Sequence, residues 1–158
     1  MTTGISDPRA RSLQGSRAGF VSQAVAALVD SGAVVAAYFV GLCLFGFVRF
    51  LVTSRPLSLP RPAVWLDVLI VGVLAVVILA SAWSGSGRSA GMSVVGLRVL
   101  TVGGRPLSPP RAWIRALLFV LTLGLGLLTV TVSRRNASLY DMVCATAVVY
   151  QWQPSRSR

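Results

Sequence analysis

The sequence predicts an all-α integral membrane protein with two to three transmembrane helices and a small β-hairpin outside the membrane. Of its 158 residues, 54% are hydrophobic and only 12% are charged, whereas soluble domains carry about 25% charged residues. Long apolar segments alternate with shorter segments that carry the arginines. We therefore expect the lipid bilayer to surround most of the chain.

The first apolar segment covers about residues 20–48, long enough to cross a bilayer core of about 30 Å. It carries one acid, Asp30. Small or polar residues recur at helical spacing on the face that holds Asp30. They are Gln23, Ala26, Ala27, Ala33, Ala37 and Gly41. Because small residues let helices approach closely and charge is costly in lipid, we expect another helix to contact this face.

A second apolar segment covers about residues 63–83. Trp65 and Trp83 lie near its two ends, about 27 Å apart along a helix. Tryptophan is enriched where membrane meets water. The spacing predicts one tryptophan at each interface.

The third apolar segment covers about residues 111–133 and is interrupted by Gly124 and Gly126. It either spans the membrane or turns back at these glycines as a re-entrant segment. With three spans and a cytoplasmic N-terminus, eight of the 15 arginines lie inside and seven outside. Re-entry places 12 inside and 3 outside, which the positive-inside rule prefers. The two arrangements place the C-terminus on opposite sides, so that side stays open.

The stretch between the second and third segments predicts a hairpin. Residues 94–102 are β-prone and lead into Gly103-Gly104, a two-residue turn signal, so we expect a hairpin over about 94–108. Further on, Ser138-x-x-Asp141 matches a helix capping box, and residues 147–152 predict a last strand or helix end. Residues 1–16 are predicted to form a disordered basic tail and 153–158 a loose tail.

The residue types argue against catalysis. All 15 basic residues are arginine, all four acids are aspartate, and His, Glu and Lys are absent. Acid–base catalysis, nucleophile activation and metal binding depend mainly on the missing types. We therefore expect no enzyme, metal site or cofactor. The net charge of +11 comes from arginines that flank apolar runs, so we expect a bilayer partner and no nucleic acid.

A series of motifs in the middle and at the end of the chain resembles a known family. The motifs are Gly87-Arg-Ser-Ala-Gly-Met-Ser-Val-Val-Gly-Leu-Arg98-Val-Leu, Gly103-Gly-Arg-Pro-Leu-Ser108, the pair Arg111 and Arg115, and Asn136-Ala-Ser-Leu-Tyr-Asp141-Met-Val-Cys-Ala-Thr146-Ala-Val-Val. In order and spacing they resemble the RDD family of membrane proteins. With Ala18-Gly-Phe20 and Asp30 the likeness covers about residues 17–150, within a predicted RDD-like membrane domain over 17–152.

The RDD family is named for one arginine and two aspartates. The resemblance matches Asp30 to the first aspartate and Asp141 to the second, whereas Gln23 stands two turns before Asp30, where an arginine would face it. We expect Asp30 to be either neutral and hydrogen-bonded to Gln23, or ionised and paired with Arg115. Asp141 is expected to cap a helix or to pair with Arg98.

The resemblance also implies a class of function. Transport is proposed for the family, cation/proton exchange is ascribed to some members, and related units accompany larger assemblies such as lipid importers of the mammalian-cell-entry type. We expect an accessory or scaffold subunit of a membrane transport assembly, bound to other membrane subunits or to itself. The alternative is an autonomous small cation/proton transporter that uses Asp30. We expect a multi-pass protein of a bacterial plasma (inner) membrane; ligand, partner and oligomeric state stay open.

Overall fold

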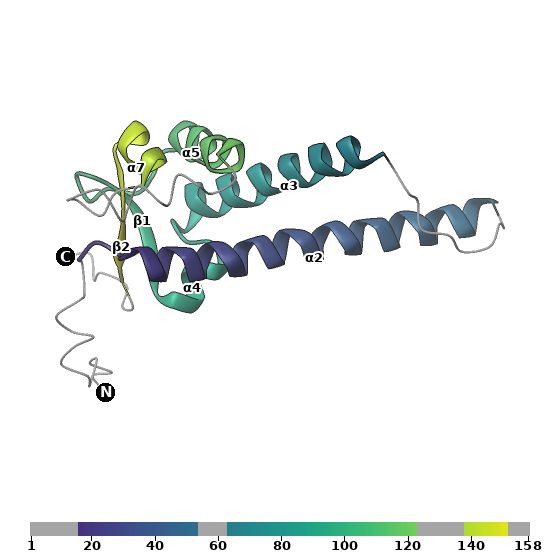
Figure 1. Ribbon diagram of the computed structural model, residues 1–158, viewed down its shortest axis with the longest axis horizontal. Coiled ribbons are helices and arrows are strands. Elements are labelled where there is room, and N and C mark those ends of the chain that lie inside the picture. Colours follow the sequence, from purple (N-terminus) through teal and green to yellow (C-terminus); the bar gives the residue numbers. More distant parts are fainter. Residues whose placement is uncertain (1–15, 54–62, 123–137, 152–158) are drawn as a thin grey trace.

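Two long apolar helices dominate the structure. The computed structural model describes residues 16–53, 63–122 and 138–151. Helix α2 covers Phe20–Thr53 and helix α3 covers Val64–Gly85, and they lie side by side in opposite directions (Figure 1). With 34 and 22 residues, they measure about 51 Å and about 33 Å. Both are long and apolar enough to cross a membrane, as predicted for 20–48 and 63–83.

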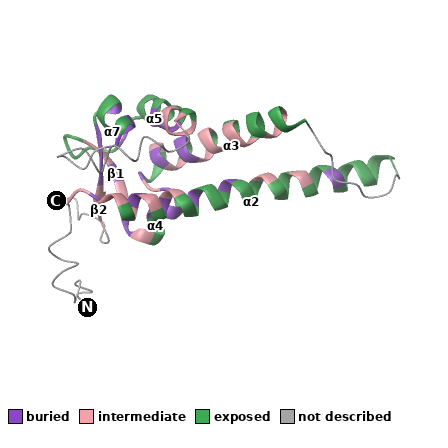
Figure 2. Ribbon diagram, in the orientation of Figure 1, coloured by how far each residue is buried: buried purple, intermediate pink, exposed green. Residues whose placement is uncertain are grey.

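The surface of α2 is apolar and mostly exposed, and that of α3 is apolar and exposed or half-buried except in its last turns (Figure 2). In the most apolar stretch of each, only 11% of the residues are buried inside the protein. Large hydrophobic side chains such as Phe39, Leu44 and Val68 are more than half exposed. A buried core helix of a soluble protein would cover such side chains. Exposed apolar surface of this kind suits contact with lipid.

The other elements gather where α2 begins and α3 ends (Figure 1). We call this part of the structure the head. It contains helix α4 (Ala90–Val95), strand β1 (Leu97–Thr101), helix α5 (Pro109–Leu121), helix α7 (Leu139–Cys144) and strand β2 (Thr146–Tyr150). Helix α5 packs on α3, and α4 packs on α2. The head therefore closes around the ends of both candidate spans.

The predicted two-stranded antiparallel sheet is confirmed, but the predicted hairpin over 94–108 is wrong. Strand β1 pairs with β2 at the end of the chain, from Leu97 opposite Tyr150 to Thr101 opposite Thr146. The Gly103-Gly104 turn does form, since Gly104 has φ +74° and donates its N–H to the Thr101 carbonyl. No strand forms between this turn and α5, over residues 103–108, where Pro106 lacks the N–H that a ladder needs.

The third apolar segment begins as helix α5. Pro109 and Pro110 occupy its first turn, where proline's missing N–H has no helical partner to lose. Ala112 and Ala116 are buried. Residues 123–137, which include Gly124 and Gly126, lie outside the described part of the chain, and with them the alternative between a span and a re-entrant segment. The predicted tails, 1–16 and 153–158, also lie outside it, apart from Ser16.

Two expectations about the long helices need correction. The small-residue face of α2 is buried only in its first turns: Ala26 is covered, whereas Ala33, Ala37 and Gly41 are exposed. Trp83 was expected at a membrane interface, but it is 2% exposed and belongs to the core of the head. The reason is the same in both cases, because the head covers the first turns of α2 and the last turns of α3.

Candidate functional site

The carboxyl group of Asp30 is held by helix α4. Its side chain is 7% exposed. Oδ2 accepts a hydrogen bond of 2.5 Å from the Ser89 hydroxyl, and Oδ1 accepts one of 2.7 Å from the backbone N–H of Gly91. Both oxygens of the carboxyl group therefore have a donor from the start of α4.

The local sequence explains why α4 presents these donors. Ser89 is the N-cap residue, and its hydroxyl accepts the N–H of Met92, the usual role of serine at a helix start. Gly96 ends the helix in the left-handed conformation at φ 73°, which favours glycine. A six-residue helix is thus fixed at both ends.

The Gly91 backbone lies directly against α2. A Cβ atom added to Gly91 would lie 2.0 Å from the carbonyl oxygen of Ala26, far inside van der Waals contact. Only glycine permits this approach. The small pair Gly91 and Ala26 therefore brings the N–H of Gly91 within reach of Asp30.

The second family aspartate, Asp141, forms a buried ion pair. It is 2% exposed, and its Oδ1 atom lies 2.9 Å from Nη2 and 3.1 Å from Nε of Arg115, which is 1% exposed. The hydroxyl of Thr146 donates to Oδ1 at 2.8 Å, and that of Ser138 donates to Oδ2 at 2.6 Å. Ser138 also accepts the N–H of Asp141, which confirms the predicted N-cap.

This environment keeps Asp141 charged. Burial alone raises the pKa of the carboxyl, but the Arg115 guanidinium and the hydrogen bonds from Ser138, Thr146 and Arg115 outweigh it. The pKa of Asp141 therefore lies below its ordinary value. Asp141 and Arg115 form a buried ion pair that connects α7 to α5.

Aromatic rings surround the guanidinium of Arg115. Its Cζ atom lies 4.2 Å from the centre of the Trp83 ring and 5.0 Å from that of Tyr140. Phe119 contacts both of these rings edge to face. Burial raises the pKa of Tyr140, so its hydroxyl stays protonated. The cation–π contacts and the ion pair with Asp141 together hold Arg115 in the head.

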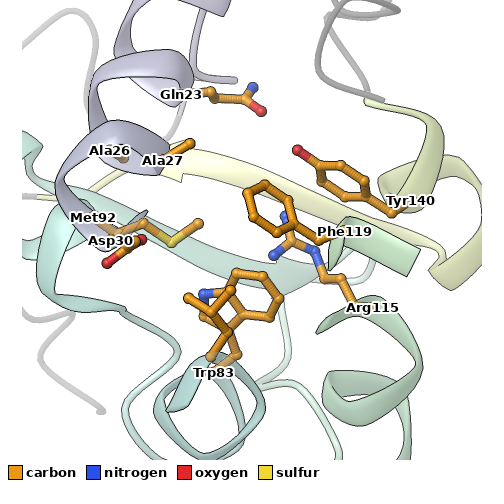
Figure 3. Close-up of a pocket in the computed structure, with 10 residues that line it drawn as sticks. Gln23, Ala26, Ala27, Asp30, Trp83, Met92, Arg115, Phe119 and Tyr140 are labelled. Atoms are coloured by element: carbon orange, nitrogen blue, oxygen red, sulfur yellow. The ribbon is translucent and has the colours of Figure 1, made fainter. Parts of the chain in front are cut away.

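A small cavity lies between these side chains (Figure 3). It has a volume of about 20 Å³, room for one water-sized group. The cavity is close to both family aspartates. Asp30 is in its wall, and so is Arg115, the partner of Asp141. The other lining residues are Gln23, Ala26, Ala27, Leu79, Trp83, Met92, Phe119 and Tyr140. This cavity is the candidate site.

The cap expected at Ser138 and Asp141 is present, but the side-chain partners predicted for the two aspartates are wrong. Arg115 pairs with Asp141 and not with Asp30. Gln23 lines the cavity, but its side-chain amide donates to the Ala18 carbonyl at 2.8 Å and not to Asp30. Arg98 does not reach Asp141; its Nη1 atom lies 3.4 Å from the side-chain oxygen of Gln151. The head supplies closer partners for both acids than the residues predicted.

Sequence reasoning missed the residues that hold Asp30. Ser89 and Gly91 lie 59 and 61 positions after it, in a Gly- and Ser-rich stretch ahead of the predicted hairpin to which no helix was assigned. A serine followed by glycine and apolar residues is a weak helix-start signal, and it gives no hint of a distant acid. Among the described residues, no group of three or more His, Cys, Asp or Glu could hold a metal ion.

Comparison with known proteins agrees with the predicted family. The model of the RDD family matches residues 17–145, which include Asp30, Arg115 and Asp141. No curated protein and no solved structure gives a significant match. The match covers most of the chain, and the two long apolar helices accord with a place in the membrane. The chain belongs to the RDD family and is a membrane protein of that family.

Proposed function

We propose that this protein is an accessory or scaffold subunit of a membrane transport assembly and is not an enzyme. The observation that carries the proposal is the use of the two family aspartates. Asp30 accepts bonds from Ser89 and Gly91, and Asp141 accepts bonds from Arg115, Ser138 and Thr146. A buried carboxyl group needs such partners. Asp30 attaches the head to α2, and Asp141 connects two helices within the head.

The outer half of α2 supplies a surface for partners. Ala33, Ala37 and Gly41 are exposed on one face, next to the exposed apolar side chain of Leu44. A Cβ at Gly41 would meet nothing within 4 Å. Small residues permit close packing of membrane helices, so this face suits a helix of another subunit or of a second copy.

The resemblance to accessory units narrows the proposal to assemblies of a bacterial plasma membrane, with the N-terminus in the cytoplasm. A lipid importer of the mammalian-cell-entry type is one such assembly. In that setting the head would lie at the end of the spans where α2 begins. The arginines of the head would then lie on the cytoplasmic side of the membrane, in keeping with the positive-inside rule.

Affinity purification from the native membrane tests the scaffold proposal. We expect the tagged protein to recover other membrane subunits in fixed proportion. The variants Ala37→Leu and Gly41→Leu should reduce the recovery, because the added side chains prevent close helix approach. Val35→Leu, a change at an exposed position on the opposite side of α2, is the matched control and should not. Recovery of this chain alone, or equal recovery by all variants, contradicts the proposal.

The second candidate function is cation or proton transport through Asp30. It is favoured by one observation, since Asp30 shares a cavity with Arg115 near the ends of both candidate spans. Proteoliposome flux decides it: a transporter would move ions above empty vesicles, and Asp30→Asn would abolish the flux while Asp67→Asn would keep it. If wild type does not exceed empty vesicles, or Asp30→Asn equals wild type, this function is excluded.

A further inference from the structure

The cavity contains two buried hydrogen-bond donors that have no partner among the described residues. They are Nε1 of Trp83 and Nη1 of Arg115. The Trp83 and Arg115 side chains are 2% and 1% exposed, and both line the cavity (Figure 3). Buried donors are almost always satisfied, because leaving one unpaired costs free energy. The two N–H groups therefore point to a ligand that accepts hydrogen bonds.

The size and charge of the cavity define this ligand. A volume of about 20 Å³ holds a single water molecule and excludes a phosphate, a carboxylate or a lipid headgroup. Asp141 already neutralises Arg115, and the carboxyl of Asp30 lies in the same wall. A halide of similar size would meet Asp30 without any excess positive charge to hold it. A neutral acceptor suits the cavity better.

We propose that the cavity binds one internal water molecule, which accepts the N–H of Trp83 Nε1 and the N–H of Arg115 Nη1. This water supplies the missing acceptor for both N–H groups and links the last turn of α3 to the Arg115–Asp141 pair.

Nuclear magnetic resonance of the tryptophan indoles tests the proposal directly. The full chain is labelled with ¹⁵N-tryptophan and placed in lipid nanodiscs, and Trp83→Phe assigns the Trp83 signal. We expect a through-space cross-peak between the Trp83 indole proton and water, with the sign of a long-lived bound molecule. The indole of Trp65, which is 70% exposed, serves as the control and should lack such a peak.

A cavity-filling variant provides a second measurement. Ala27 lines the cavity, so Ala27→Val adds carbon atoms to its wall and should remove the bound-water cross-peak of Trp83. Ala36→Val adds the same atoms to an exposed position on α2 and should leave the peak unchanged. If Ala27→Val does not fold, the wild-type spectrum alone decides the question.

Two results overturn the proposal. One is a wild-type Trp83 indole proton that shows no contact with a long-lived water. The other is a saturable shift of the Trp83 signal when bromide is titrated into halide-free protein, because the ligand would then be an anion. A Trp83–water cross-peak that bromide leaves unchanged supports the proposal.

Discussion

Arg115 donates two hydrogen bonds to one oxygen of Asp141, from Nε at 3.1 Å and from Nη2 at 2.9 Å. The two residues lie 26 positions apart, on α5 and α7. Their contact joins α5 to α7, and α7 leads after one residue into β2, which pairs with β1. The ion pair thus connects the middle motif of the family to its closing motif.

Removing the Arg115 charge should destabilise the protein strongly. In Arg115→Met the apolar stem remains, but Asp141 is left as a buried charge, which costs about 3–5 kcal/mol of unfolding free energy. Arg111→Met on the exposed face of α5 is the matched control and should change the free energy by less than about 0.5 kcal/mol. Denaturant titration in detergent measures both. Equal losses for the two variants would show that the ion pair contributes nothing specific.

Acid should weaken the same contact. Because the pKa of Asp141 is lowered in the folded protein, its carboxylate adds stability at every pH above its unfolded value of about 3.9. This contribution disappears as the pH falls through the lower, folded-state pKa. The difference in Tm between wild type and Asp141→Asn should therefore shrink below about pH 4. A difference that stays constant from pH 7 to pH 2 would contradict a lowered pKa.

The close contact of α4 with α2 depends on a missing side chain. Gly91→Ala places a Cβ 2.0 Å from the Ala26 carbonyl oxygen, so α4 must move away from Asp30, at a cost of about 1–3 kcal/mol. Gly32→Ala, on α2 with nothing within 4 Å of its added Cβ, is the control and should be neutral or slightly stabilising. Thermal unfolding in detergent compares the two, and a tolerated Gly91→Ala would mean that the helices do not pack this closely.

How far the sequence predicts this structure depends on how far apart along the chain the interacting residues lie. The two long helices follow from composition, and the N-cap at Ser138 follows from a motif of four residues. The partners of Asp30 do not follow from a local pattern. Gln23 was expected because it lies on the same helix, whereas the actual donors, Ser89 and Gly91, come from a distant segment whose position is set by packing. Arg115 is a buried partner of an aspartate, as expected, but the aspartate is Asp141 on α7 and not Asp30.

The sheet illustrates the same limit. The β-prone run around Val99 and the Gly103-Gly104 turn are both real, and together they predict a local hairpin. Val99 instead pairs with Val148, since the chain after the turn enters α5 at Pro109. A local turn signal cannot reveal that a better partner strand arrives at the end of the chain.

The hydroxyl of Ser89 has two roles, and its removal should affect both. It accepts the N–H of Met92 as the cap of α4 and donates to Asp30, so Ser89→Ala leaves one oxygen of the buried carboxyl without its donor and should cost about 1–3 kcal/mol. Ser93→Ala is the control, because its exposed hydroxyl bonds only a backbone carbonyl of the same helix. In a double-mutant cycle, Ser89→Ala should cost less in an Asp30→Ala background, where the acceptor is already absent. Additive losses would show that Ser89 acts on α4 alone and does not hold Asp30.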